Sequence, residues 1–320
     1  MKMNDCFFKV LRAGINSSFQ DEGRFRLQHF GLPPGGCMDY KSFSIANALV
    51  GNKKNEGILE FAYQGPMLKL IKGNTKIAIT GNVHFKIINS NTTIDGKCDR
   101  SYNLKEGDIL DILATQKSVY GYLSVESGFK LKSFLNSVST LAKANIGPNK
   151  GSKIKLDDNL IINEVIKNKN NFKTSISYDD SSMIRVLKGS QYDYFSEESK
   201  KNFFNQKYKI TKLTDRMGMR LQGINLKNIV NTNIRSEGIT KGAIQVPADG
   251  QPIILLTDHP TIGGYPKIAN IISADYDLLV QKTPGTNIQF KCISLREAEQ
   301  LFKDRNNYIS KVIKNIEEII

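Results

Sequence analysis

The sequence predicts a mainly β protein with a few helices, arranged as two β-barrel-like domains in tandem and a C-terminal helix. Three observations lead to this expectation. Short alternating or apolar runs recur along the chain, Gly, Asn and Asp separate many of them, and no regular β-α-β alternation is present. This pattern is typical of sandwiches and barrels and argues against a dinucleotide-binding fold.

The predicted strands are short runs bounded by turn-forming residues, in which apolar side chains alternate or follow one another without interruption. A Gly-centred turn also leads into an alternating strand in both halves, at Lys105–Ile112 and at Thr283–Phe290. This loose repetition is consistent with two related units. The predicted strands are Thr75–Thr80, Val83–Asn89, Val119–Val125, Ile184–Leu187, Lys207–Thr211, Ile253–Thr257 and Asn287–Ile293.

Two helices are indicated by their capping residues. Asp39 is suited to cap a helix that runs to about Val50 and ends at Gly51, because its carboxylate accepts from the first turn and glycine favours the terminating conformation. Ser196 opens a shorter helix that ends near Asn205.

A change of composition predicts the domain boundary. Asn and Lys interleave through residues 161–182, with Asp and Ser at the end, which is typical of a linker. We therefore expect an N-terminal β domain over 1–160 and a C-terminal β domain over 183–320. The second domain ends in a helix over 295–320, because Ser294–Glu297 forms a capping box and apolar residues follow at helical spacing.

Composition is that of a soluble globular protein, with 40% hydrophobic and 24% charged residues in 320. No run of about 18 apolar residues is present to span a membrane, and the N-terminus lacks the features of a signal peptide. The cysteines are not spaced as C-x-x-C and only 3 histidines occur, so we expect no metal site and a reducing, cytoplasmic location. These cysteines are Cys6, Cys37, Cys98 and Cys292.

The net charge of +14 is consistent either with a polyanionic partner or with a general excess of lysine. The lysines are scattered, basic runs such as Lys53-Lys54 are short, and no nucleic-acid-binding motif is present. We therefore expect no nucleic-acid partner. Phosphate-loop, H-E-x-x-H and G-x-S-x-G motifs are also absent from the sequence, so the common nucleotide, metalloprotease and serine-hydrolase sites lack support.

The most informative segment is Asp258–Lys267, which follows the apolar run Ile253–Leu256. Two prolines and two adjacent glycines redirect the chain there, while five chemically different polar groups lie within ten residues. Functional residues concentrate on loops held by rigid elements, and glycines allow close backbone approach or a positive φ. The candidate residues of this loop are Asp258, Thr261, Gly263, Gly264, Tyr265 and Lys267.

Three further segments carry candidate residues. In Phe19–Arg24, Asp21 and Arg24 could hold an anionic substrate group or form a structural ion pair, and the residue types favour neither. Arg216 follows an aspartate at a turn, where surface ion pairs are common and weak. Gln245 lies on a strand bracketed by glycines and could offer its amide to a polar ligand.

Taken together, these phrases resemble the biotin-dependent carboxyltransferase family, which is allophanate hydrolase subunit 2-like and includes the C subunits of 5-oxoprolinases. The usual sequence motifs of the family are F-Q-D-x-G-R, G-V-P-x-S-G-x-M-D, S-D-R-M-G-x-R-L-x-G, S-E-G, G-A-I-Q-V-P-x-D-G-Q-P and T-x-G-G-Y-P-K-I-A. The matching segments here are Phe19–Arg24, Gly31–Asp39, Thr214–Gly223, Ser236–Gly238, Gly242–Pro252 and Thr261–Ala269. The resemblance covers nearly the whole chain apart from the linker and the last helix.

The chain departs from the family pattern at several positions. Gly35 stands where serine is usual, Ser127 where glycine is usual, His259-Pro260 where Arg-Gln is usual, and Ile262 where threonine is common. The loop scaffold is therefore similar to that of the family, while its side-chain chemistry is locally altered.

The resemblance implies two cyclophilin-like β-barrel domains, corresponding to carboxyltransferase subdomains A and B. It also implies a hetero-oligomer with an A-type subunit and with a B-type subunit that is itself cyclophilin-like. The implied reaction is the opening of 5-oxo-L-proline to L-glutamate, with ATP bound through the complex. One alternative is transfer of a carboxyl group to urea or a related amide from carboxybiotin that a partner carries. A second alternative is a non-catalytic regulatory partner of a kinase inhibitor that resembles the B-type subunit.

On the matching positions, the resemblance leads us to expect four catalytic residues. Arg24 would bind carboxylate or phosphate, Asp39 or Asp258 would act as general base or acid, and Lys267 would lie near developing negative charge. The residues expected to bind substrate are Gln20, Asp21, Arg216, Gln245, Thr261, Gly263, Gly264 and Tyr265.

Overall fold

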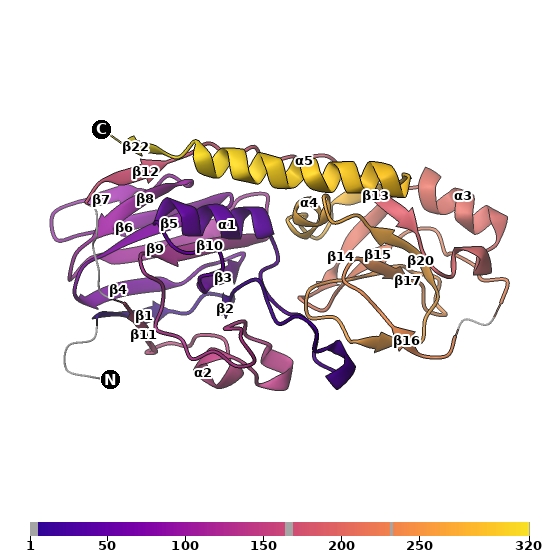
Figure 1. The fold of residues 1–320 in the computed structure, drawn as a ribbon, viewed down its shortest axis with the longest axis horizontal. Helices are drawn as coiled ribbons and strands as arrows, with labels where there is room; N and C mark the ends of the chain where they lie inside the picture. The colour runs from indigo at the N-terminus through magenta and orange to yellow at the C-terminus, as the bar shows by residue number, and fades with distance from the viewer. Residues whose placement is uncertain (1–5, 164–168, 231–232, 320) are drawn as a thin grey trace. The chain divides into compact units, whose positions relative to one another are not determined.

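The structure, a computed structural model, describes residues 6–163, 169–230 and 233–319. The chain forms two compact units, and Figure 1 shows the course of the chain through them. Unit 1 is formed by Met1–Arg24, Gly35–Ser177 and Tyr308–Ile320, and unit 2 by Phe25–Pro34 and Tyr178–Asn307.

This division differs from the one drawn from composition. Most of residues 161–182, which composition assigned to a linker, belong to unit 1, and two strands overlap that stretch. These are β11 (Asn159–Ile162) and β12 (Asn171–Lys173). The short segment Phe25–Pro34 belongs to unit 2, and the last part of the C-terminal helix belongs to unit 1.

Two antiparallel sheets form unit 1. The first has the order β11-β1-β4-β9-β6-β7 and the second β2-β3-β10-β5-β8-β12-β22. Apolar side chains from both sheets make one buried core that includes Phe8, Phe61, Phe85 and Leu123. The remaining strands are β1 (Cys6–Arg12), β2 (Asn16–Gln20), β3 (Ile58–Ala62), β4 (Met67–Lys72), β5 (Thr75–Thr80), β6 (Val83–Ile88), β7 (Thr93–Asp95), β8 (Arg100–Leu104), β9 (Ile109–Thr115), β10 (Tyr120–Val125) and β22 (Glu317–Ile319).

Unit 2 contains a closed barrel of order β13-β20-β17-β18-β15-β14-β21. Its core includes Phe203 and Phe290, whose rings stack with centroids 4.6 Å apart. A separate two-stranded sheet joins β16 to β19. The strands are β13 (Met183–Lys188), β14 (Tyr208–Thr214), β15 (Gly218–Gln222), β16 (Glu237–Gly238), β17 (Ala243–Gln245), β18 (Ile253–Leu255), β19 (Ile262–Gly263), β20 (Lys267–Ile271) and β21 (Asn287–Cys292).

The helices begin at the capping residues that the sequence indicates. Asp39 accepts from the backbone N–H of Ser42 at 3.0 Å, and Ser196 accepts from that of Ser199 at 3.1 Å. Gly51 has φ +72° after the first of these helices, as a left-handed terminator should. The α-helices are α1 (Tyr40–Leu49), α2 (Pro148–Gly151), α3 (Glu197–Asn205), α4 (Tyr276–Val280) and α5 (Leu295–Lys314), and the 3₁₀ turns are η1 (Gln28–Phe30), η2 (Ala142–Ala144) and η3 (Tyr192–Tyr194).

The C-terminal helix is shorter than expected. It ends at Lys314, and Glu317–Ile319 forms β22 instead of continuing the helix to residue 320. The edge of β12 provides the alternative, because Asn171 pairs with Ile319 and Lys173 with Glu317. Ile316 and Phe172 also pack against the same apolar cluster.

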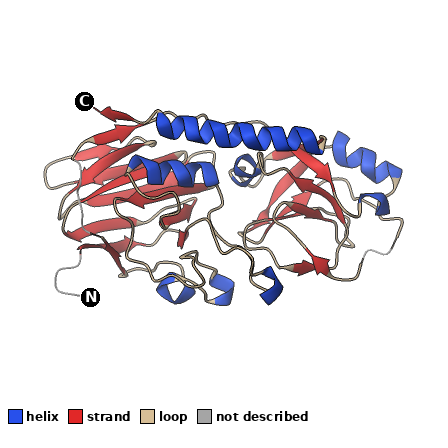
Figure 2. Ribbon diagram, in the orientation of Figure 1, coloured by secondary structure: helices blue, strands red, loops and turns tan. Residues whose placement is uncertain are grey.

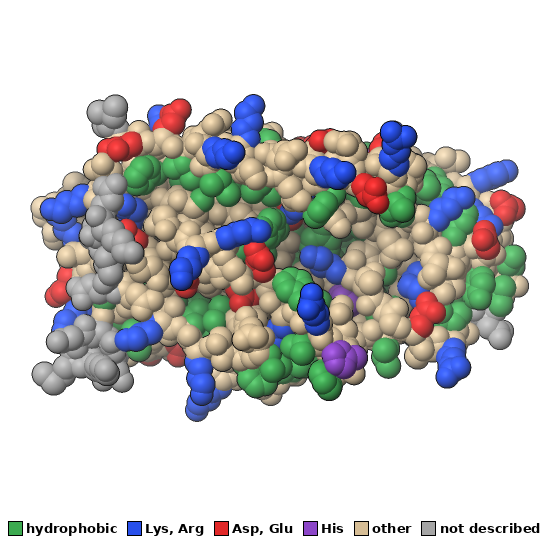
Figure 3. Space-filling view, in the orientation of Figure 1, with side chains coloured by type: hydrophobic (Ala, Val, Ile, Leu, Met, Phe, Trp, Pro, Cys, Tyr) green, Lys and Arg blue, Asp and Glu red, His purple; other side chains and the backbone are tan. Residues whose placement is uncertain are grey.

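The mainly β prediction is confirmed, as Figure 2 shows by the predominance of strands over helices. Every predicted strand overlaps an observed one. On the face shown in Figure 3, Lys and Arg side chains are interspersed with other residue types and form no continuous basic patch. Within the described ranges, no helix is both long and apolar enough to cross a membrane.

Candidate functional site

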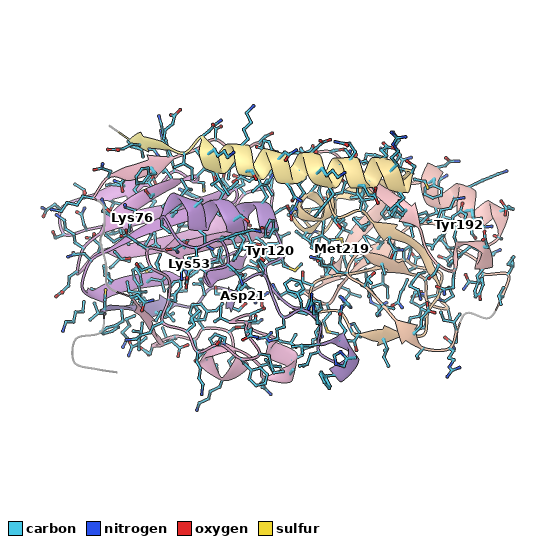
Figure 4. The ribbon with its side chains drawn as sticks, in the orientation of Figure 1. Asp21, Lys53, Lys76, Tyr120, Tyr192 and Met219 are labelled. Carbon is cyan, nitrogen blue, oxygen red and sulfur yellow. The ribbon has the colours of Figure 1, made fainter. Side chains whose placement is uncertain are left out.

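The first group of candidate residues lies in unit 1, where β2 ends. Asp21, labelled in Figure 4, accepts from the Ser137 hydroxyl at 2.7 Å and from the backbone N–H groups of Gly23 and Val138, each at 2.8 Å. The Ser139 hydroxyl lies 2.5 Å from the Gln20 side-chain oxygen, to which it donates. Both oxygens of the buried Asp21 carboxylate are therefore used to hold the segment that follows residue 136.

Arg24 binds the same segment. Its Nη2 donates to the backbone oxygen of Ser139, and the side chain is buried. Gly35 lies beside it with φ +64°, and a Cβ there would be 3.0 Å from the Ser139 hydroxyl and 3.6 Å from Arg24 Nη1. Glycine at position 35, where the family usually has serine, thus avoids a close contact with the Ser139 hydroxyl. These contacts give Gln20, Asp21 and Arg24 a role in positioning the 137–140 segment.

Asp39 is built into a second buried network of unit 1. Its Oδ1 accepts from the Ser42 N–H and its Oδ2 from the Ser42 hydroxyl at 2.7 Å. The Asp39 N–H donates to the Tyr122 hydroxyl at 2.7 Å, which in turn donates to Glu60 at 2.9 Å. Burial and the charges of Glu60 and Asp39 raise the pKa of Tyr122 well above its usual value. This geometry supports helix capping as the function of the Asp39 carboxylate.

In unit 2, Arg216 and Asp258 form a bidentate ion pair. Arg216 Nε lies 2.9 Å from Asp258 Oδ2, and Nη2 lies 3.0 Å from Oδ1. A backbone bond of 2.8 Å from Asp258 N–H to the Arg216 oxygen adds to the pairing. Asp215, the neighbour in sequence, instead accepts from the N–H groups of Met217 and Gly218 within the turn. Arg216 therefore fixes the orientation of the Asp258 carboxylate across 42 positions of sequence.

Lys267 lies in a network with Gln191, Glu237 and Gln245, which we call the Lys267 network. The ammonium of Lys267 is paired with Glu237 Oε1. The Gln191 side-chain amide donates to the same oxygen at 2.9 Å, and its own oxygen accepts from the Lys267 N–H at 3.2 Å. The Lys267 side chain is only 6% exposed, whereas that of Glu237 is 43% exposed. Hydrogen bonds from Lys267 and then Gln191 lower the pKa of Glu237.

Gln245 explains why the loop needs glycine at position 263. It opposes Lys267 in the pairing of β17 with β20. A Cβ on Gly263 would lie 2.6 Å from the Gln245 side-chain nitrogen, which is closer than a carbon and an amide nitrogen can approach. One on Gly264 would lie 3.2 Å from the Ile234 oxygen. Neither glycine has a positive φ. Close approach therefore accounts for Gly263, and at Gly264 a Cβ would make a tighter contact that a small shift could relieve.

The rest of the loop exposes apolar and aromatic surface. Tyr265 is 40% exposed and Ile262 63% exposed. The Tyr265 backbone oxygen accepts from the Gln245 amide at 3.5 Å, and the Thr261 oxygen accepts from the Ile239 N–H at 3.1 Å. The structure thus brings Gln245, Gly263, Tyr265 and Lys267 together through side-chain or backbone contacts.

His259 is a buried member of this loop. Its Nδ1 lies 2.6 Å from the Pro260 oxygen. Nε2 has no hydrogen-bond partner in the part of the chain that the structure describes. Burial is the main cause that lowers the pKa of His259, with a further contribution from the Lys241 charge, so the imidazole is neutral at neutral pH.

The architecture and these networks define a mainly β protein that presents carboxylate, amide and ammonium groups on the loops of a closed barrel. The chain belongs to the family described as "Carboxyltransferase domain, subdomain A and B". The model of this family matches residues 30–292. The resemblance inferred from the sequence motifs is therefore confirmed.

Relatives share sequence along nearly the full chain. It is 33% identical over 310 residues to the C subunit of 5-oxoprolinase from Haemophilus influenzae, covering 97% of this chain and 98% of that protein. It is 32% identical to the C subunit of 5-oxoprolinase from Escherichia coli, and the match covers 95% of this chain and 97% of that protein. Among solved structures, urea amidolyase of K. lactis matches with a TM-score of 0.88 and 29% identity. That match covers 98% of this chain but only 20% of the larger protein.

Sequence reasoning missed three residues that organise these sites. Glu237 lies in the S-E-G phrase, so the motif match could have drawn attention to it as a partner for a buried cation. Ser139 and Gln191 belong to no matched phrase. Their contacts arise from segments 119 and 76 positions away in the chain, for which the sequence carries no local signal.

Proposed function

We propose that this chain is the C subunit of an ATP-dependent 5-oxoprolinase, which opens 5-oxo-L-proline to L-glutamate together with A- and B-type subunits in the cytoplasm. The observation that carries the proposal is the Lys267 network, because it combines a buried ammonium at the end of the family's signature loop with the side-chain amides of Gln191 and Gln245 from neighbouring segments. Such groups suit a small substrate that contains both an amide and a carboxylate. The near full-length similarity to two 5-oxoprolinase C subunits supports the same assignment.

Within this proposal, the chemistry requires activation of an unreactive lactam. Phosphorylation of the lactam oxygen by ATP, which we assign to the complex, would activate the carbon for addition of water. The C–N bond would then break, with the nitrogen leaving as the protonated amine, and the resulting acyl phosphate would be hydrolysed by a second water to phosphate and L-glutamate. Asp258 would accept a proton from the attacking water, and Arg216 would hold its carboxylate in position through the bidentate pair. Lys267 would stabilise negative charge on the substrate. In this scheme Arg24 and Asp39 maintain the loops of unit 1.

A second candidate is a carboxyltransferase for urea or a related amide. The structural match to K. lactis urea amidolyase favours it. This function would require carboxybiotin on a carrier supplied by a partner, and Asp258 would then accept a proton from the amide nitrogen that becomes carboxylated.

The proposal is tested with the full chain reconstituted with A- and B-type subunits. Glutamate release from 5-oxo-L-proline and ATP hydrolysis would be measured for the wild type and for Asp258→Asn. Loss of the proton acceptor should reduce kcat by about 100-fold or more, as for other general bases. The matched control is Ser310→Ala on the exposed part of α5, which should retain wild-type turnover.

Unchanged kcat in Asp258→Asn would contradict the assignment of the general base. Binding of the B-type subunit without turnover of 5-oxo-L-proline, urea or other small amides would instead favour a regulatory protein.

A further inference from the structure

A half-exposed carboxylate covers a buried ammonium in unit 2. Lys267 extends from β20 of the barrel and is 6% exposed, while its partner Glu237 is 43% exposed. The two residues belong to different sheets. Lys267 is on the barrel strand β20, whereas Glu237 is on β16, which pairs with β19 outside the barrel. The exposed part of this ion pair is therefore contributed by the two-stranded sheet.

The groups around Glu237 have the arrangement of a carboxylate receptor. Lys267 Nζ and Gln191 Nε2 both contact the single oxygen Glu237 Oε1. The Gln191 side chain is itself oriented, because its oxygen accepts from the backbone N–H of Lys267 at 3.2 Å. Gln191 is 8% exposed, and its bond to the backbone of β20 holds it beside Lys267. The bond from Gln191 to the carboxylate is charge-assisted and belongs to the stronger class of hydrogen bond, and Lys267 adds the attraction of an ion pair.

We propose that Lys267 and Gln191 form a carboxylate-binding subsite that Glu237 occupies in this structure, and that the carboxylate of a ligand binds by replacing Glu237. A buried ammonium is costly to leave without a counter-ion, so Glu237 leaves only when another anion takes its place.

This inference deepens the proposed function. Assigning the carboxylate of 5-oxo-L-proline to the subsite rests on that function, whereas the subsite itself rests on the contacts of Lys267 and Gln191. Glu237 would then act as an internal competitor that keeps the ammonium paired until substrate arrives. The ligand class is a small monocarboxylate.

The test compares wild-type protein with Glu237→Gln in ligand titrations of the full chain followed by NMR. The probes are acetate, 5-oxo-L-proline and the neutral lactam 2-pyrrolidinone, and the reporter is the side-chain amide of Gln191. Removing the internal competitor should increase the affinity for both carboxylates at least tenfold and shift the Gln191 resonance. The affinity for 2-pyrrolidinone should not change.

Equal carboxylate affinity in the two proteins, or no carboxylate binding to Glu237→Gln, would overturn the subsite. A higher affinity of Glu237→Gln for acetate, without a higher affinity for 5-oxo-L-proline, would support the subsite and contradict the proposed substrate. Gln191→Leu introduced into Glu237→Gln provides a second variant, in which no competing carboxylate is present and the backbone N–H of Lys267 serves as the reporter. It should weaken carboxylate binding to the folded protein at least threefold, and unchanged binding there would also refute the proposal.

Discussion

At the scale of single residues, the groups with the most reactive chemistry are all held by specific neighbours. Arg216 orients Asp258, and Gln191 and Glu237 surround Lys267. The sequence predicted that Asp258 and Lys267 belong to a functional loop. It could not predict their partners, because an ion pair or amide contact between distant segments depends on the register of the barrel strands and leaves no local pattern.

Asp39 illustrates a different limit of prediction at this scale. One side chain matched two patterns, a helix cap and a family motif suited to a general base. The contacts from Ser42 to both carboxylate oxygens favour the cap. Residue type alone does not distinguish these roles, since both need an ionised carboxylate near hydrogen-bond donors.

Substitution of Gly263 tests the packing of the signature loop. Gly263→Ala should displace Gln245, because the new Cβ would lie 2.6 Å from its side-chain nitrogen. We expect at least a tenfold loss of kcat/KM for 5-oxo-L-proline in the reconstituted complex. Gly238→Ala is the matched control on the paired strand β16, where a Cβ meets open space. Equal activity of the two variants would show that Gln245 is not positioned through this contact.

The buried His259 should make stability depend on pH. Its pKa is lowered in the folded state, so below the unfolded pKa near 6.5 the unfolded chain binds a proton that the folded chain does not. Stability should therefore fall as pH decreases from 7 towards the folded pKa. Denaturant unfolding at several pH values would show a shallower fall for His259→Gln. Parallel curves that differ by a constant offset would report lost packing alone and would contradict the assignment.

At the scale of elements, hydrophobic patterns predicted some of the strands, and capping residues predicted three of the helices, α1, α3 and α5. The turns at Lys105–Ile112 and Thr283–Phe290 also have equivalent geometry. Gly107 and Gly285 have φ of +93° and +94°, and each donates its N–H at 2.8 Å to a strand of the same unit, at Leu70 and Ile210 respectively. The loose sequence repetition thus reflects a repeated turn. The strand pairings of β12 and β22 escaped prediction because these short segments acquire strand form only through partners far along the chain.

The cap of α5 is an element-scale test of stability. The Ser294 hydroxyl accepts from the Glu297 N–H at 3.2 Å, so Ser294→Ala should destabilise the protein by about 1 kcal/mol. Denaturant unfolding would measure the difference. Ser310→Ala, at an exposed position within the same helix, removes a hydroxyl of the same size and should change stability by less than about 0.5 kcal/mol. Equal effects would argue against capping by Ser294.

At the scale of the whole molecule, the two units contribute differently. Unit 1 contains the buried networks around Ser139 and Asp39, which position loops. Unit 2 contains the Arg216–Asp258 pair and the Lys267 network, which have the groups expected of a site for a small amide with a carboxylate. Family membership follows from motifs distributed over both units, and this is why the sequence identified the family more readily than the substrate.

The most direct test of the account is glutamate formation by the reconstituted complex. With 5-oxo-L-proline, ATP and the A- and B-type subunits, addition of this chain should produce glutamate and ADP in equal amounts, and its omission should abolish both. Glutamate formation that does not depend on this chain would contradict the account. Carboxylation of urea with a biotin carboxylase and biotinyl carrier, in the absence of any turnover of 5-oxo-L-proline, would contradict it equally and establish the carboxyltransferase function instead.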